Sequence, residues 1–526
     1  PAFGVIDVEI CRRDVEVASG NGGHRGIERS AQTFEPHQLE EIVRIVELTP
    51  IRGVEGVHVD TGTRRGNESS LVERSALASG KTSSYVLDAD LADDGDAVPV
   101  VSPMMNPSAT GRPLEDLDLS RIDPLWSGPM EERLEGFSAL RRHDPIRFFA
   151  EEGNEYLAAG PGYWAVTRHA DVVEASRRPD AFCSGEGTNI PDLPPEFREF
   201  FGSMINMDDP RHARFRKIVS AGFTPRMMRS LEDGVVSTAS GIVDRVAGLG
   251  SCDFVTEVAA RLPLVVICDM MGIAADRHDE VFDLSNIVLS QGDPEYIPVG
   301  SNPLEAFLTA GAGLSAIMQE TAAGRRGGDG EDLTSLLVNA EVDGERLTTE
   351  ELSAFFVLLC VAGNETTRNA ISWGLHYLTT NPDQRDRWLA DIDGVMSTAV
   401  DEIVRMSSPV IHFRRTATAD GVRLGDQEFK AGEKLVLWYA SANRDEVVFV
   451  DPDRFDVTRD PNPHVGFGGP GPHFCLGAHL ARREVGVMFR ELLTRLPDSH
   501  ATAEPDRLRS NFVNGIKHLP CEFTPA

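Results

Sequence analysis

Hydrophobic residues recur with helical spacing over most of the chain after about residue 120. Residues Thr348–Thr380 are apolar on nearly all sides, which predicts a long buried helix that begins at a capping box of Thr348 and Glu351. Apolar residues also follow Cys475 at three- and four-residue steps, which predicts a helix that begins directly after this cysteine. We therefore predict a mainly α-helical protein.

Alternating patterns indicate only short strands. Residues 155–158 and 163–167 are predicted to be two strands around Gly160–Gly162, and a further strand is predicted at Val422–Leu424. Near the end, Phe512–Ile516 fits a terminal hairpin. Small β-sheets should therefore accompany the helices.

Residues 1–103 differ from the rest in composition. They contain no Met, no Trp and one Lys, and only Gln38–Leu48 has the spacing of a short amphipathic helix. We predict a disordered or non-native extension over 1–103 and a globular domain over 104–526, because the first methionines are Met104 and Met105. A small regulatory segment is the alternative.

Charge and cysteine use narrow the possible functions. The net charge of −32 disfavours binding to nucleic acid or to an acidic membrane surface. The longest apolar runs, such as Phe355–Ala362, are too short for a membrane span. Seven scattered cysteines without CxxC spacing indicate a reducing cytoplasm and no disulfides. We therefore expect a cytoplasmic protein.

One cysteine has an unusual setting. Glycines and prolines keep Phe467–His473 out of regular structure, and Cys475 ends this loop where the next helix is predicted to begin. The N–H groups and dipole of a helix N-terminus favour a thiolate, which lowers the thiol pKa and suits metal binding. Gly477 would let a flat group approach the helix. A lone buried cysteine is usually inert, but this loop has no other obvious use.

The loop resembles the haem-binding loop of the cytochromes P-450, the haem-thiolate monooxygenases, through Phe467, His473, Cys475 and Gly477. The resemblance implies haem b with Cys475 as the axial ligand of the iron, whose thiolate favours O–O cleavage. It also implies a triangular helical prism, with haem between a long central helix and the helix after the cysteine. Cys475 follows Phe467 by eight residues, which is longer than the usual spacing in the family. This longer loop resembles the variant found in a bacterial lipid- and steroid-oxidising branch of the family.

The same resemblance assigns roles on the central helix. Ala362–Thr366 resembles the oxygen-activating segment of the family, in which Gly363 permits a local widening of the helix. Glu365 and Thr366 would then form the acid–alcohol pair that passes protons to bound dioxygen. A kinked helix with internally satisfied hydroxyls is the plainer alternative.

Other residues match family positions that surround the haem. His212 and Arg216 lie four residues apart on a predicted helix and would bind haem propionates, as would Arg415 and His473. Adjacent Arg414 should point the other way on its strand. Without the resemblance, His212 and Arg216 would be ascribed to a solvated basic helix face.

A structural triad is also implied. Glu402 and Arg405 form Glu-x-x-Arg, a pattern that is weak alone in a chain with 25% charged residues. The family pairs these two residues with an arginine of a later loop, which we predict to be Arg454. A buried arginine needs its carboxylate, so we predict a structural role for all three residues.

Several strings, among them Val361–Ile371 and Asn462–Gly469, resemble the actinobacterial methyl-branched lipid ω-hydroxylases. Only residues 476–526 follow Cys475, so we expect no fused reductase domain. By analogy with the family, electrons from NAD(P)H should arrive through a separate ferredoxin reductase and ferredoxin. The expected substrates are O2 and an apolar lipid, sterol or terpenoid. Steroid side-chain monooxygenase and terpenoid hydroxylase are the alternatives, followed by a peroxygenase and a non-enzymatic haem sensor. The resemblance also implies that the tip of the hairpin at Phe512–Ile516 lines the substrate cavity. The substrate stays unnamed because 184–205 and 286–306, which should shape the cavity, are poorly patterned.

Overall fold

The computed structural model describes residues 117–120, 125–153, 159–193, 198, 200–201, 203–222, 225–290, 292–341 and 344–526, except the side chains of 221–228 and 230. The extension predicted over residues 1–103, its helix at Gln38–Leu48 and the strand predicted at 155–158 lie outside these residues. The description below concerns the described part of the chain.

A long helix runs through the centre of this part. It consists of α11 (Thr349–Leu359), a wider π-helical turn η7 (Cys360–Asn364) and α12 (Glu365–Thr380), which follow one another without interruption. Thr348 and Glu351 form the predicted capping box, in which each side chain bonds the backbone N–H of the other. Most side chains of α11 and α12 are buried, so the prediction of a central buried helix is confirmed.

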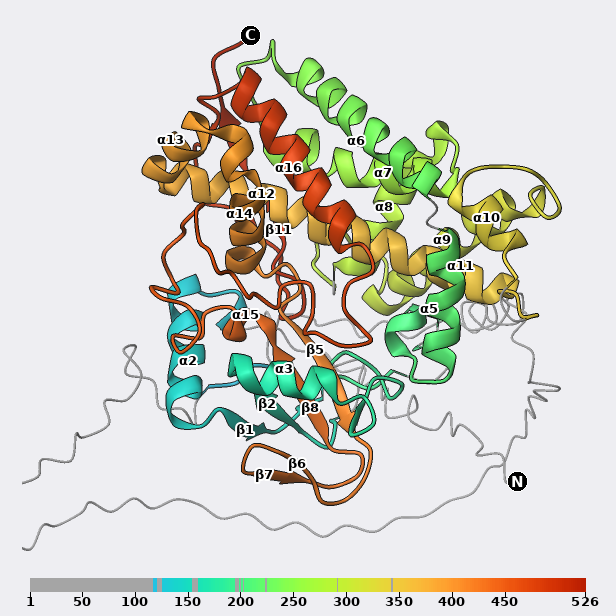
Figure 1. Cartoon of the computed structure of the whole chain (residues 1–526), viewed down its shortest axis with the longest axis vertical. Helices are drawn as coiled ribbons and strands as arrows, with labels where there is room; N and C mark the ends of the chain where they lie inside the picture. Colours follow the sequence, from blue (N-terminus) through green and yellow to red (C-terminus); the bar gives the residue numbers. More distant parts are fainter. Residues whose placement is uncertain are drawn as a thin grey trace, which may run out of the picture. The chain divides into compact units, whose positions relative to one another are not determined.

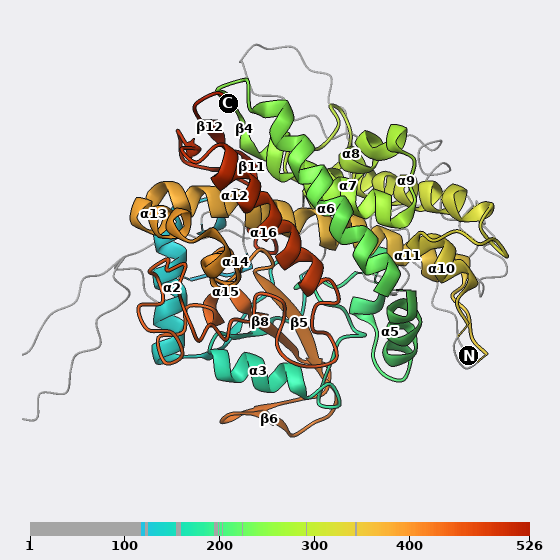
Figure 2. The ribbon, with the colours of Figure 1, turned by 45° about the horizontal axis from the view of Figure 1, so that its top comes forward.

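Two groups of helices bury this central helix. On one side α12 packs with α6 (Pro225–Val246), α14 (Ile392–Ser407) and α16 (Ala478–Arg495) in the largest apolar core. Figure 2 shows α6 and α16 side by side across α12. The helix predicted after Cys475 is thus present as α16, but it begins at Ala478, because Leu476 and Gly477 form a turn.

The second group covers α11. It contains α7 (Arg261–Met271), α8 (His278–Leu289) and α9 (Pro303–Ala323), together with α5 (Arg211–Gly222) and α10 (Leu333–Asn339). Their apolar side chains form a second core with Phe355 and Phe356 of α11. This core fixes the widened turn η7 between α7 and α8.

The main sheet has five strands in the order β1-β2-β8-β5-β3. The strands β2 (Tyr163–Val166) and β8 (Lys434–Trp438) pair in parallel, and β8 pairs antiparallel with β5 (His412–Ala417). The strand predicted at 163–167 is therefore confirmed, and it pairs with β1 (Ile146–Phe149). In Figure 1 the strands of this sheet lie on the side of α12 opposite to α6.

Smaller sheets hold the C-terminal residues. The strand β12 (Pro520–Glu522) lies between β4 (Ser251–Asp253) and β9 (His500–Ala501), and β10 (Asp506–Arg507) pairs with β11 (Ile516–His518). The strand predicted at Val422–Leu424 is present as β6. The remaining elements are α2 (Met130–His143), α3 (His169–Arg177), β3 (Phe182–Cys183), η4 (Ser203–Asn206), η5 (Val255–Ala259), η6 (Ala275–Arg277), α13 (Pro382–Ala390), β7 (Gln427–Phe429) and α15 (Tyr439–Ala442).

Candidate functional site

The loop before α16 is shaped by close contacts with α3. A Cβ atom on Gly469 would lie 2.2 Å from the Ser176 hydroxyl, and one on Gly471 would lie 2.2 Å from the Ser176 carbonyl oxygen. Only glycine fits at these two positions. The loop then closes on itself, because the Cys475 N–H donates to the Phe467 carbonyl at 3.0 Å. The spacing of eight residues therefore brings Phe467 and Cys475 together.

The sulfur of Cys475 is available to another group. The Cys475 side chain is accessible to solvent. Many protein atoms nevertheless surround its thiol, and they shift the thiol pKa. Burial raises the pKa of the thiol, and the Gly477 N–H, Arg216 and Arg482 oppose that rise only in part. The lowered pKa predicted for Cys475 is therefore wrong for the free thiol. A coordinated metal ion would supply the missing stabilisation of the thiolate.

A group of cationic and imidazole side chains lies beside the loop. The rings of His212 and His473 are 4.2 Å apart, and Arg216 donates to the carbonyls of Pro472 at 3.1 Å and Phe474 at 2.8 Å. The structure thus brings together the predicted pair on α5 and the loop. It also shows that Arg216 fixes the loop, which the sequence did not indicate.

The fourth member of this group, Arg415, is buried on β5 and donates to the Arg414 carbonyl at 2.8 Å. Arg414 is directed elsewhere, as predicted, and forms an ion pair with Asp192. Burial, with Arg415 and His212 nearby, lowers the pKa of His473 to about 2, so its imidazole is neutral and can still donate one hydrogen bond.

These side chains fit an anionic cofactor. No described carboxylate forms an ion pair with Arg216 or Arg415, and the buried Nε2 of His212 has no hydrogen-bond partner among the described residues. Buried donors without partners are costly, so two carboxylates of a bound group would satisfy this cluster. Gly477 offers room for a flat group, because no atom lies within 4 Å of where its Cβ would be.

The central helix widens at the predicted position. The π-helical turn Cys360–Asn364 contains Gly363, on which a Cβ atom would lie 2.8 Å from Ile267 of α7. The prediction that Gly363 lies at a widened turn is confirmed, and close packing against Ile267 explains the glycine. The Thr366 hydroxyl donates to the Ala362 carbonyl at 2.6 Å across this turn. Val361, Ala362, Gly363 and Thr366 are partly exposed in a helix that is otherwise mostly buried.

Glu365 is fully buried and does not contact Thr366 through a hydrogen bond. Its carboxylate forms an ion pair with Arg368 and accepts a hydrogen bond from the Asn369 side chain at 2.9 Å. Arg368 in turn donates to the Asn286 side chain of α8 at 2.8 Å. The sequence reasoning missed Arg368, Asn369 and Asn286. The signal for Arg368 was the Glu-x-x-Arg pattern at residues 365–368, within a helix that is predicted to be buried.

The predicted triad exists with a different third member. Arg405 donates to both oxygens of Glu402, at 2.7 and 2.8 Å, and both side chains are fully buried. Arg459, not Arg454, completes the group, because its Nε lies 3.1 Å from both Glu402 oxygens. Arg454 is exposed and contributes its carbonyl oxygen, which accepts from Arg405 and Arg459. The assignment of Arg454 to the triad was therefore wrong.

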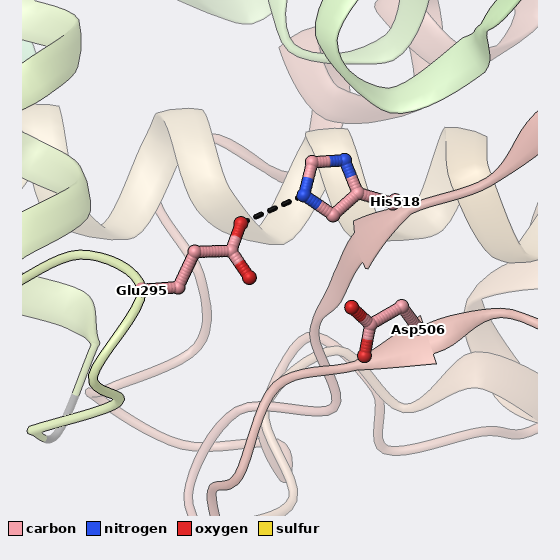
Figure 3. A group of neighbouring side chains, drawn as sticks. All are labelled: Glu295, Asp506 and His518. Carbon is pink, nitrogen blue, oxygen red and sulfur yellow. Dashed lines mark hydrogen bonds and ion pairs between the residues drawn. The ribbon is translucent and has the colours of Figure 1, made fainter.

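A second ionic cluster joins the segment after α8 to the C-terminal strands (Figure 3). His518 Nε2 lies 2.7 Å from Glu295 Oε1, and Nδ1 of the same ring pairs with Asp253. Lys517 Nζ lies 2.8 Å from Glu295 and 3.6 Å from Asp506. Since the lysine already supplies positive charge to these carboxylates, we interpret the group as an ion-pair cluster and not as a metal site.

A small apolar group borders the widened turn. Leu289, Leu508 and Val513 are buried together, and Tyr296, Val361 and Phe512 pack against them. Phe512 and Val513 belong to the segment predicted to line the cavity. The segment therefore lies beside Val361 of the widened turn, as a cavity wall would require.

An accessible cysteine on a tight glycine loop, a cationic cluster beside it and a widened buried helix together define a haem-thiolate protein. The chain belongs to the cytochrome P-450 family. The sequence model described as Cytochrome P-450 matches residues 314–519. The protein is thus a haem-containing oxidoreductase that incorporates oxygen, takes electrons from redox partners and acts on a lipophilic substrate.

Individual relatives match more than two thirds of the chain. A methyl-branched lipid omega-hydroxylase of Mycobacterium tuberculosis is 48% identical over 415 residues, which are 78% of this chain and 96% of the relative. A steroid C26-monooxygenase of Mycolicibacterium smegmatis is 41% identical over 76% of this chain and 91% of its own length. A Mycobacterium marinum cytochrome P-450 solved in complex with pseudoionone is 46% identical, with a TM-score of 0.73 over 78% of this chain and 99% of that one.

Within the described residues, no helix is both long enough and apolar enough to cross a membrane.

Proposed function

We propose that this monooxygenase hydroxylates the terminal methyl carbon of a methyl-branched lipid. The observation that carries the proposal is the 48% identity to a methyl-branched lipid omega-hydroxylase over 96% of that protein's length. The apolar group around Leu289 and Val361 beside the widened turn supports an apolar substrate.

In this proposal the Cys475 thiolate would hold the iron of haem b. His212, Arg216, Arg415 and His473 would bind its two carboxylates, and Gly477 would leave room for its ring. Phe467, which packs under the Arg482 guanidinium at 4.3 Å, supports the loop on the cysteine side. The haem, when bound, supplies the activation of O2 and the insertion of one oxygen atom into a C–H bond.

The two polar residues of the central helix would handle protons. Thr366 holds its hydroxyl proton toward the Ala362 carbonyl and can exchange it with a group that lies over the widened turn. Glu365 would supply protons from the buried side of α12. Since the two side chains are not hydrogen-bonded to each other, a proton that passes through both needs a side-chain rotation or an intervening water.

The pocket must also select the terminal carbon. Terminal C–H bonds are stronger than neighbouring ones, so the substrate has to be held with its methyl end foremost. Phe512 and Tyr296, which pack beside Val361, are suited to confine a branched chain at this point.

We propose a ferredoxin and a ferredoxin reductase as the electron source. Exposed His479 and Arg483 on the first turns of α16 support this choice, because they lie near Cys475 in a chain with a net charge of −32. Local positive charge of this kind favours the docking of a small acidic protein.

The test is a panel of a phytol-like branched lipid, cholestenone and a monoterpenoid. Binding is scored by the optical shift of the haem, and turnover is measured with ferredoxin, reductase and NAD(P)H. We expect the branched lipid to give the terminal alcohol with the highest kcat/KM. A higher kcat/KM for cholestenone would replace the proposal by the second candidate, a steroid side-chain monooxygenase, which the 41% identity to a steroid C26-monooxygenase favours.

A separate measurement tests Cys475. The reduced protein under carbon monoxide should show the strongly red-shifted absorption band of thiolate-ligated haem, and the Cys475→Ser variant should lack it. If the variant kept the band, another cysteine would be the ligand. Turnover without any electron donor but with added hydrogen peroxide would instead support the peroxygenase alternative, which the presence of Glu365 and Thr366 disfavours.

A further inference from the structure

A Glu-x-x-Arg ion pair other than Glu402–Arg405 lies on α12, directly after the widened turn. Glu365 and Arg368 are 0% and 4% exposed, so both charges are removed from water. Such burial costs several kcal/mol for each ion unless partners compensate it. The compensation is incomplete, because Arg368 Nε has no partner among the described residues and Glu365 Oε2 is held only by the ion pair. A pair that served stability alone would be expected to satisfy these atoms.

The remaining contacts of the pair lead to two different elements. Arg368 Nη1 donates to Asn286 of α8, while Asn369 donates to Glu365 and accepts from the Ile516 N–H of β11 at 3.1 Å. The carboxylate is thus held along α12 toward the C-terminal strands, and no hydrogen bond connects it to Thr366.

The helix α8 is bonded to the central helix at two adjacent residues. Ser285 accepts a hydrogen bond from Asn364 of the widened turn at 3.3 Å, and Asn286 accepts from Arg368. The same helix ends at Leu289, in the apolar group that borders this turn. A substrate that displaces α8 would therefore also displace the partner of Arg368.

We propose that Arg368 is a positioning residue for Glu365, and that its bond to Asn286 makes the placement of this carboxylate depend on the position of α8. The inference rests on the proposed function, in which Glu365 supplies protons. Arg368 sets the distance and direction from the Glu365 carboxylate to Thr366. Asn286 holds the Arg368 guanidinium in place through its hydrogen bond from α8. The binding of substrate against α8 is in this way linked to proton supply at the central helix.

Two variants test the inference from opposite ends of the link. Arg368→Ala removes the guanidinium, and Asn286→Leu removes only its bond to α8 while it fills a similar volume. Misplacement of a reacting group by about 1 Å costs up to ~100-fold in rate. For each variant we expect product per NAD(P)H consumed to fall roughly 10-fold, as for the loss of an orienting partner. Arg368→Lys should recover part of the yield, because an ammonium can still pair with Glu365.

The readouts separate positioning from damage to the fold. We expect the carbon monoxide band and the optical shift on substrate binding to stay within about 2-fold of the unmodified protein, while the solvent deuterium isotope effect on product formation rises. Arg387→Ala is the matched control, because this exposed arginine of α13 pairs with Asp456 at 3.9 Å and takes part in none of these contacts. It should change neither yield nor isotope effect. If Arg368→Ala fails to bind haem, Asn286→Leu alone decides.

Glu365→Gln distinguishes failure of the inference from failure of the proposed function. If Glu365→Gln lowers the yield and Asn286→Leu and Arg368→Ala do not, Glu365 supplies protons without Arg368 and the inference is wrong. If Glu365→Gln has the yield and isotope effect of the unmodified enzyme, the proton role of Glu365 itself is wrong. A lower product yield in all three variants, together with a raised isotope effect, supports both the proton role of Glu365 and the positioning role of Arg368.

Discussion

The chain contains Glu-x-x-Arg in two buried helices, and the two copies are bonded very differently. Glu402 accepts from Arg405, Arg459, Asn462 and the Asp456 N–H, so its carboxylate is saturated. Arg405 also donates to the carbonyls of Asn443, Pro452 and Arg454. The copy at Glu365 and Arg368 has fewer partners and leaves Arg368 Nε without one among the described residues.

This difference teaches that helical spacing sets only which side chains meet. In both copies the residues lie three apart on one helix face and form an ion pair. The partners supplied by other elements decide the rest. A saturated pair fixes a loop in one position, whereas an incompletely bonded pair beside the widened turn can change partners during a reaction. We interpret the first copy as structural and the second as functional.

The largest predicted effect compares the two arginines directly. Arg405→Ala should lower the free energy of unfolding by about 3–5 kcal/mol, because it removes the buried partner of Glu402 and the donor to three backbone carbonyls. Arg368→Ala should cost less, about 1–3 kcal/mol, because Arg368 bonds only Glu365 and the Asn286 side chain among the described residues. Urea unfolding of each purified variant measures this, with the yield of protein that shows the carbon monoxide band as a second measure. Equal losses would contradict the division into structural and functional copies.

The next prediction tests the corrected third member of the structural copy. Arg459→Leu removes a charged donor from Glu402 and should cost about 1.5–3 kcal/mol of unfolding free energy. Arg454→Leu is the matched control in the same loop, since this side chain is exposed and only its backbone carbonyl bonds the triad. It should stay within about 0.5 kcal/mol of the unmodified protein. A larger loss in Arg454→Leu than in Arg459→Leu would reinstate the assignment made from the sequence.

A third prediction concerns the widened turn beside the functional copy. Thr366→Ala removes the hydroxyl that donates to the Ala362 carbonyl, and should change haem and substrate binding little. Product per NAD(P)H should fall roughly 10-fold or more, with the electrons recovered as hydrogen peroxide or water, because general acid–base groups contribute at least this much. Thr366→Ser should retain most of the yield. Unchanged yield in Thr366→Ala would exclude the hydroxyl from proton supply.

Much of the fold could be predicted because its signals are local. The capping box at Thr348 and the apolar run after it define the central helix, and the glycines before Cys475 define a loop that packs against another element. The resemblance of Ala362–Thr366 to the family's oxygen-activating segment indicated the widened turn at Gly363. Each of these features depends on residues that are close in sequence.

The errors concern features that depend on distant elements. The third arginine of the triad could not be chosen from spacing, because Arg454 and Arg459 belong to the same loop and only the folded loop shows which one turns to Glu402. The thiol pKa of Cys475 was misjudged, because burial by surrounding elements outweighs the local backbone donor. The link from Arg368 to Asn286 joins two helices that are 82 residues apart in sequence.

The smallest predicted effect lies in the exposed cluster around His518, which contrasts with both buried copies. Partial burial lowers the pKa of His518, but hydrogen bonds to Asp253 and Glu295 outweigh it, so the pKa is raised overall. Because the folded-state pKa is the higher one, the stabilising contribution is fully present below the unfolded value of about 6.5 and is lost as the pH rises through the folded value. The side chain is 44% exposed, so solvent screening limits the effect to below about 1 kcal/mol.

His518→Gln should therefore lower the thermal midpoint slightly at pH values below about 6.5 and have no effect well above the folded pKa. The measurement is thermal unfolding of both proteins across this pH range, at low and at high salt. Salt should reduce the difference, because exposed ion pairs are screened. A difference that grows as the pH rises would show that His518 acts as a neutral hydrogen-bonding group. The cluster would then join the segment after α8 to the C-terminal strands without the charge of His518.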